Sequence, residues 1–216
     1  MVREFIVSVA LLFCIETGMA QVNSTQYKAR EFKCWCVNNG NRIGRKLSST
    51  FYSNLGFAVS DTSYTFEGQR FYKTNQLFLE NSFIAFNGDY VWLLQTDRNW
   101  GRKTTSMKLF DFKAKVGDSW SLADSTLYED YLIRYSGNFD VTELKDTIYS
   151  YEVEFWPWTA HSEHLKYYLV SRVNGIRGLI YVSESGFASI CTDFVNKRQV
   201  KNTLKQILNI TEESAK

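Results

Sequence analysis

Short runs of aromatic and β-branched residues, separated by turn residues roughly every eight to twelve positions, dominate the chain from residue 63 onward. No helical periodicity lies between these runs, so the pattern predicts an antiparallel meander that forms a barrel or a sandwich. A lipocalin-like barrel is one version of this mainly β fold. The expected strands cover 32–37, 64–66, 70–72, 76–79, 83–86, 90–95, 107–116, 131–135, 147–155, 165–172, 179–182 and 187–191.

Two segments predict particular elements: a tight hairpin and one long strand. Asn87-Gly88-Asp89 separates two apolar runs and predicts a hairpin, because an Asn-Gly pair accepts the positive φ angles of a tight primed turn. From Met107 to Val116, apolar and polar residues alternate, which predicts one long strand with a single apolar face. Gly117-Asp118 would then turn the chain, and a strand would start back at Trp120.

The C-terminal segment follows a different period. Val200, Leu204, Ile207 and Leu208 recur at helical spacing, with lysine and glutamine between them. This predicts an amphipathic helix over 196–209 whose apolar stripe packs on the sheet. A helix that binds a partner or lies on a membrane is the alternative.

The first twenty residues resemble a bacterial export signal. Arg3 precedes an apolar run from Phe5 to Ile15, and Gly18-Met19-Ala20 places small residues where a signal peptidase cleaves, so we expect cleavage before Gln21. A lipoprotein signal ending at Cys14 is the alternative, although Phe13 stands where that class has a small residue. No later stretch is apolar for long enough to span a bilayer, so no transmembrane segment is expected in the mature chain.

Composition and charge narrow the function class. Only one proline and 16% aromatic residues favour strands over disorder. Removal of residues 1–20 takes away Arg3, Glu4 and Glu16 and raises the net charge from +2 to +3, which is too mild to predict nucleic-acid binding. We therefore expect a single β-rich domain over 21–192 with the helix and tail over 193–216 packed on it.

Three cysteines remain after the expected cleavage: Cys34, Cys36 and Cys191. An oxidising compartment allows one disulfide and leaves one thiol. Cys34 and Cys36 point the same way on an extended segment, so either one is a candidate partner of Cys191. A metal site would need further cysteines or nearby histidines, and the sequence supplies neither, so no metal and no cofactor are predicted.

The string from Leu109 to Trp120 resembles the "LYDF…KVGD" segment of exported, uncharacterised β-rich proteins of the Bacteroidetes group. Asn174-Gly175-Ile176-Arg177-Gly178-Leu179 and the later Cys191 are similar to a second segment of those proteins, except that Arg177 changes their Gly-Ile-Gly pattern. The resemblance implies a periplasmic, outer-membrane-associated or secreted protein with a β-rich fold. It implies no activity.

Candidate chemistry is sparse. His161-Ser162-Glu163-His164 is the one histidine cluster and, with a third ligand, would suit a metal-dependent or other hydrolase. Glu152 and Glu154 share one face of an expected strand and could pair as acid and base on a glycoside, although the alternation around them is typical of the wet face of a sheet.

The run Phe155-Trp156-Pro157-Trp158 is the best candidate binding surface, since an outward indole can stack on a sugar ring or an apolar partner. Trp92 and Trp100 lie near the Asn-Gly hairpin. The sequence does not decide whether their rings pack in the core or lie on the surface. We therefore expect a non-catalytic envelope protein that binds a glycan, a lipid or another envelope protein through Trp156 and Trp158. A hydrolase that uses His161 and His164 is the alternative.

Overall fold

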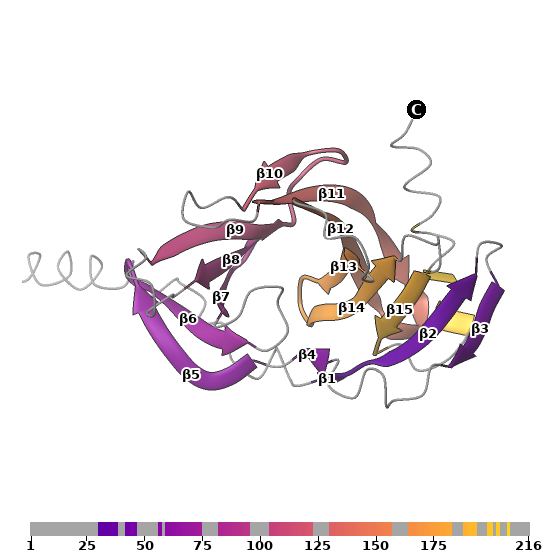
Figure 1. The fold of residues 1–216 in the computed structure, drawn as a ribbon. Coiled ribbons are helices and arrows are strands. Elements are labelled where there is room, and N and C mark those ends of the chain that lie inside the picture. The colour runs from indigo at the N-terminus through magenta and orange to yellow at the C-terminus, as the bar shows by residue number, and fades with distance from the viewer. Residues whose placement is uncertain are drawn as a thin grey trace, which may run out of the picture.

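The computed structural model is built mainly from β-strands in antiparallel sheets, as predicted (Figure 1). It describes residues 30–38, 42–46, 56–57, 59–74, 82–95, 104–122, 130–156, 164–182, 188–193, 198–200, 202–203 and 207. Within this part of the chain, no helix has the length and apolar character needed to cross a membrane. The expected strand over 76–79 lies outside the described residues.

The first sheet has five strands, which lie side by side in chain order. They are β5 (Val59–Phe66), β6 (Gln69–Thr74), β7 (Ser82–Asn87), β8 (Tyr90–Gln95) and β9 (Thr105–Asp111).

The second sheet has eight strands, and its last two come from the start of the chain. In spatial order they are β10 (Ser119–Ser121), β11 (Asp130–Val141), β12 (Asp146–Trp156), β13 (His164–Ser171), β14 (Gly175–Val182), β15 (Ala188–Thr192), β2 (Lys33–Asn38) and β3 (Arg42–Lys46). The short 3₁₀-helix η2 (Thr142–Leu144) joins β11 to β12, and β1 (Arg30–Glu31) pairs separately with β4 (Gly56–Phe57).

The two sheets do not close into a barrel, so the barrel and lipocalin-like alternatives are wrong. β9 and β10 follow each other in the chain but belong to different sheets. The predicted strand over 107–116 is also wrong beyond Asp111, where the chain leaves the ladder. The Asp111 carboxylate accepts a hydrogen bond from the Lys113 N–H at 2.9 Å, and Gly117 adopts a φ of 93°, so local polar contacts form a turn. Val116, expected on the apolar face, is 57% exposed.

One apolar core joins the sheets. Ile84, Leu93 and Phe110 from the five-stranded sheet meet Ile133, Tyr151 and other residues of the eight-stranded sheet in a single buried cluster. Phe110 and Tyr151 are in contact, with ring centroids 4.7 Å apart. The Tyr151 hydroxyl donates a hydrogen bond to the Asp111 carbonyl at 2.9 Å, and burial raises the pKa of this phenol far above its usual range. Rings fill the space between the sheets.

The opposite face of the eight-stranded sheet carries a second core. Residues 198–200, 202–203 and 207 are helical, and Val200 and Ile207 pack against Ile148, Leu169 and Ile190 of the sheet. Val200 and Ile207, two residues of the predicted amphipathic stripe, therefore face the sheet. Leu204 and Leu208 lie outside the described residues.

The hairpins are held by turns of the expected kind. Asn87 pairs with Tyr90, so Gly88 and Asp89 form the two-residue connection, and Gly88 has a φ of 54°. The hairpin prediction is confirmed, although the turn begins one residue later than the Asn-Gly pair suggested. Glu67 and Gly68 connect β5 to β6, and both have positive φ angles (48° and 78°), which is the pattern of a type I′ turn.

Candidate functional site

Aromatic side chains cover the outer face of the five-stranded sheet, away from the shared core. Successive side chains of a strand point to opposite faces of the sheet, so the residue next to one that enters the core lies on this outer face. Cross-strand pairing then places Phe83 beside Leu94 and Ala85 beside Trp92, while Ile84 pairs with Leu93 on the inner face. The strand pattern therefore creates an apolar surface on a sheet whose other side is already buried.

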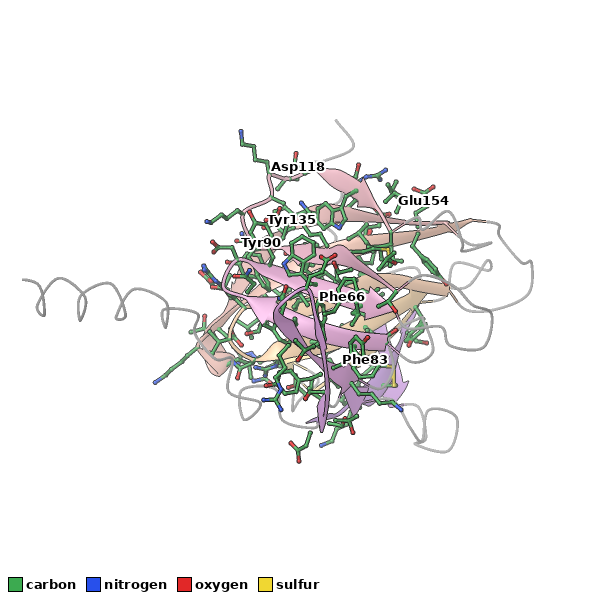
Figure 2. The ribbon with its side chains drawn as sticks, turned by 90° about the vertical axis from the view of Figure 1, so that its left-hand side faces the viewer. Phe66, Phe83, Tyr90, Asp118, Tyr135 and Glu154 are labelled. Carbon is green, nitrogen blue, oxygen red and sulfur yellow. A yellow bond between two sulfur atoms is a disulfide. The ribbon has the colours of Figure 1, made fainter. Side chains whose placement is uncertain are left out.

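This outer face has a packed floor and a layer of rings above it. Phe71, Ala85 and Leu94 are 1%, 2% and 0% exposed and form the floor. The half-buried side chains of Phe66, Phe83 and Trp92 pack against them. We call the five rings on this surface the aromatic face: Tyr64, Phe66, Phe83, Tyr90 and Trp92. Figure 2, turned toward this side of the molecule, shows Phe66 and Phe83 over the sheet.

The rings contact one another as well as the floor. The ring centroids of Tyr64 and Phe83 are 6.3 Å apart at an interplanar angle of 55°, although β6 lies between their strands. Tyr90 and Trp92 are also 6.3 Å apart, at 51°. The Trp92 indole nitrogen is buried and makes no hydrogen bond within the described structure, so this side chain offers a ring surface and no polar group. Such mutual packing fixes the rings in place.

Two lysines belong to this face. Lys108 pairs with Trp92 across β8 and β9, and its ammonium lies 2.9 Å from the Asp111 carboxylate and 4.7 Å from the centroid of the Trp120 ring. Lys73 lies directly opposite Phe83 in the β6–β7 ladder, is exposed, and has no ion pair within the part of the chain that the structure describes. Lys108 is thus neutralised by its neighbour, and Lys73 is not.

The space between the sheets offers no comparable site in the described structure. One narrow recess there is too small to hold a water molecule, and its lining is wholly apolar: Ile84, Phe86, Val91, Leu109, Phe110, Val170 and Ile176. A lipid-sized lumen, which a carrier of the lipocalin kind requires, is not present between the described strands.

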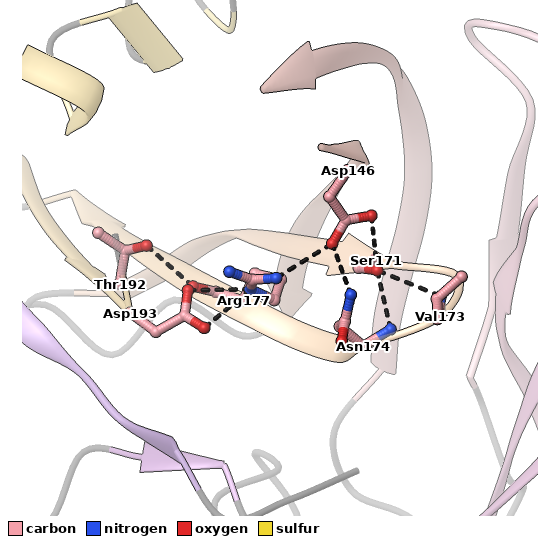
Figure 3. A network of polar contacts seen from close by, with 7 residues as sticks. All are labelled: Asp146, Ser171, Val173, Asn174, Arg177, Thr192 and Asp193. Atoms are coloured by element: carbon pink, nitrogen blue, oxygen red, sulfur yellow. Dashed lines mark hydrogen bonds and ion pairs between the residues drawn. The ribbon is translucent and has the colours of Figure 1, made fainter. Parts of the chain in front are cut away.

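A buried ionic network lies at one end of the eight-stranded sheet (Figure 3). The side chain of Arg177 is 7% exposed, and its Nη1 lies 3.0 Å from Oδ2 of Asp146 while its Nε lies 2.8 Å from Oδ2 of Asp193. Ser171 and Asn174 also donate hydrogen bonds to Asp146, at 3.0 Å and 2.9 Å. The network ties the start of β12, the β13–β14 turn and the end of β15 together.

Sequence reasoning noticed Arg177 only as a departure from a Gly-Ile-Gly pattern. The available signal was a charged residue between Ile176 and Gly178 in an otherwise apolar strand, since a charge there must be paired when the strand is covered on both faces. Its partners lie 31 and 16 residues away, so they could not be named. Because every charge in it is paired, we assign the network to the fold.

The two glutamates proposed as an acid and base pair lie on the face of the eight-stranded sheet opposite the shared core. Arg134 reaches both of them, with Nη1 at 3.3 Å from Glu152 and Nη2 at 3.9 Å from Glu154. Burial and the Glu152 charge raise the pKa of the neighbouring Tyr167 phenol above its usual range. This arrangement is an ion-paired surface of a sheet, as the alternation around Glu152 and Glu154 indicated.

The predicted binding and histidine residues fall mostly outside the described structure. Trp156 is the last residue of β12, but its side chain is not described, and Trp158 and His161 lie beyond the described residues. His164 begins β13, again without a described side chain. The described residues contain no group of three or more acidic, histidine or cysteine side chains that could hold a metal ion. The binding surface at Trp156 and Trp158 and the hydrolase alternative both stay predictions.

Cys34 and Cys191 form a disulfide, with Cα atoms 4.0 Å apart and a sequence separation of 157. They are directly paired on the neighbouring strands β2 and β15. The sequence left open whether Cys34 or Cys36 would take this position. Cys36 pairs with Ser189 in the same ladder, and its side chain lies outside the described set.

Comparison with protein-family models, curated proteins and solved structures gives no match for this chain. The resemblance to exported Bacteroidetes proteins therefore stays a prediction.

Proposed function

We propose that this chain is an exported, non-catalytic module of the bacterial envelope that binds a carbohydrate chain through the aromatic face. The observation that carries the proposal is the layer of half-buried rings packed on the floor of Phe71, Ala85 and Leu94. Rings held by their neighbours lose little conformational entropy when a ligand stacks on them. A binding surface of this kind needs no catalytic group.

The shape of the surface favours a sugar over a lipid. Pyranose rings present flat C–H faces that stack on aromatic rings, whereas an acyl chain needs an enclosing pocket. The aromatic face extends over β5, β7 and β8 and is built on a sheet. An extended glycan would lie across several rings at once.

Export is part of the proposal. The signal-like residues 1–20 and the Cys34–Cys191 disulfide both suit an oxidising compartment outside the cytoplasm. A periplasmic, outer-membrane-associated or secreted location is compatible with both features.

The proposal is tested by affinity gel electrophoresis of the purified protein in gels that contain single soluble polysaccharides, followed by titration of tryptophan fluorescence with any that retard it. Tyr64→Ser should weaken binding by about two- to tenfold, since one ring contact contributes roughly 0.5–1.5 kcal/mol. Tyr64 is 37% exposed, so this change should leave the fold intact. Val173→Ser, which alters another exposed apolar residue (59%) in the turn between β13 and β14, is the matched control and should bind as wild type.

Two results would contradict the proposal. Equal binding by the wild type and Tyr64→Ser would place the glycan elsewhere, with the predicted surface at Trp156 and Trp158 as the next position to mutate. Concentration-dependent dimerisation that Tyr64→Ser abolishes, without glycan binding, would make the aromatic face a protein interface.

A further inference from the structure

The charges around the aromatic face are unequal, and this bears on which glycan it binds. The outer positions of β6, β7 and β8 carry aromatic, aliphatic, amide and lysine side chains, and within the described residues no carboxylate lies on these three strands' outer face. Arg70 belongs to the other face, where its Nε lies 2.9 Å from the Ser63 hydroxyl and its guanidinium stacks over Tyr72. The charge that matters therefore comes from the two lysines of this surface.

Lys108 and Lys73 differ in what surrounds them. The Lys108 ammonium is neutralised by Asp111 and held between the Tyr90 and Trp120 rings, at 5.9 Å and 4.7 Å from their centroids. Lys73 is exposed and, among the described residues, has no carboxylate partner. The aromatic face thus carries one exposed lysine, near the end of β6, that forms no ion pair with any described residue.

That charge lies beside a ring. Residues directly opposite each other in an antiparallel pair have Cβ atoms about 4.5–5.5 Å apart, and Lys73 is directly opposite Phe83. A sugar stacked on the Phe83 ring would bring an anionic substituent within reach of the flexible Lys73 ammonium. A ring and a cation at this spacing are complementary to a sugar that has one apolar face and one negative group.

We propose that the ligand of the aromatic face is an acidic glycan, whose sugar stacks on Phe83 while its carboxylate or sulfate pairs with Lys73. This inference rests on the carbohydrate-binding function proposed above and adds the charge of the ligand. The pairing is exposed to solvent, so it selects among glycans more than it strengthens binding.

The experiment compares two matched pairs of polysaccharides: polygalacturonate with its fully methyl-esterified form, and dextran sulfate with dextran. In about 20 mM salt, the protein should bind at least one acidic member about three- to fivefold more tightly than its neutral counterpart, and the preference should fall toward one near 0.5 M salt because exposed charges are screened. The pair that shows the preference tells whether the carboxylate or the sulfate is recognised.

Two variants separate a specific contact from general attraction. Lys73→Gln should lose the preference while it keeps affinity for the neutral member. Lys33→Gln removes an exposed lysine from the eight-stranded sheet and should keep the preference, although the net charge changes equally. A preference that survives in Lys73→Gln would overturn the assignment to this residue.

Failure of the inference and failure of the proposed function are distinguishable. Equal binding of the acidic and neutral members overturns the acidic-glycan inference and leaves a carbohydrate-binding face. Absence of binding to all four polysaccharides and to every other glycan tested overturns both.

Discussion

The carboxylate of Asp89 forms an ion pair with the guanidinium of Arg172, and this contact joins the two sheets at one end. Asp89 lies in the turn between β7 and β8, and Arg172 lies in the turn between β13 and β14. Arg172 also donates a hydrogen bond from Nε to the Gly88 carbonyl at 3.1 Å, and Lys113 forms a second ion pair with Asp89. Two hairpins that belong to different sheets are therefore held together by one carboxylate.

We predict that this contact makes stability depend on acid pH. The hydrogen bond and charge of Lys113, with the charge of Arg172, lower the pKa of Asp89 from its ordinary value of 3.8. A carboxylate with a lowered pKa in the folded state contributes stability above pH 3.8, and this contribution disappears as the pH falls through the folded pKa. Urea unfolding from pH 6 to pH 2 should show wild type more stable than Asp89→Asn at the upper end, with the two curves converging at the lower end. A constant difference would rule out titration of Asp89 as its cause.

We predict that loss of Arg177 is severe. Arg177→Met leaves the carboxylates of Asp146 and Asp193 buried without their cation, which should lower the free energy of unfolding by about 3–5 kcal/mol. Arg134→Met is the matched control, because it breaks an ion pair whose arginine side chain is 43% exposed and should cost no more than about 1 kcal/mol. Urea unfolding monitored by circular dichroism compares them. Equal losses for both variants would mean that the buried network contributes no more than a surface pair.

We predict opposite responses to asparagine at two glycines. A Cβ on Gly178 would lie 3.1 Å from both the Cys191 carbonyl oxygen and Cδ1 of Leu169, so Gly178→Ala should cost about 1–3 kcal/mol and Gly178→Asn more. At Gly88, nothing lies within 4 Å and the φ is +54°, so Gly88→Asn should be better tolerated than Gly88→Ala. The four variants are ranked by thermal melting. Better tolerance of asparagine than alanine at Gly178 would show that crowding is not the constraint there.

We predict that the disulfide is a main contributor to stability. It closes a loop with a sequence separation of 157 residues, so Cys34→Ser should lower the free energy of unfolding by about 2–5 kcal/mol. Cys36→Ser should leave the bond intact. Non-reducing peptide mapping of Cys36→Ser should recover a linked peptide that contains Cys34 and Cys191. If the bond were instead lost in that variant, Cys36 would be the partner of Cys191.

The sequence predicted most strands because local alternation and turn residues determine them. The runs at 83–86 and 90–95 became β7 and β8, and the helical period placed Val200 and Ile207 on the sheet. The strand prediction failed where local polar contacts overrode alternation. At the end of β9, the Asp111 carboxylate accepts a hydrogen bond from the Lys113 N–H, and the chain turns there. Alternation also does not tell how strands group into sheets, so it could not choose between a barrel and two separate sheets.

The candidate site was less predictable than the strands. The sequence left open whether Trp92 lies in the core or on the surface. Its position follows only from the structure, in which the neighbouring Leu93 faces the second sheet. The contact between Tyr64 and Phe83 crosses an intervening strand and has no signature in the sequence. Only the strand register, which places Lys73 opposite Phe83, identifies this lysine as a candidate binding residue.

The pairing of β2 with β15 has a consequence for how the protein is made. β2 begins at Lys33, early in the chain, but one of its two hydrogen-bonding neighbours, β15 at 188–192, is the last strand of the sheet to be made. β3 can pair with one edge of β2 early, but the edge that β15 covers stays unpaired until residues 188–192 are made, and unpaired edges are prone to aggregate. We therefore expect this edge of β2 to need protection by chaperones until the C-terminal segment is made and Cys34 can meet Cys191.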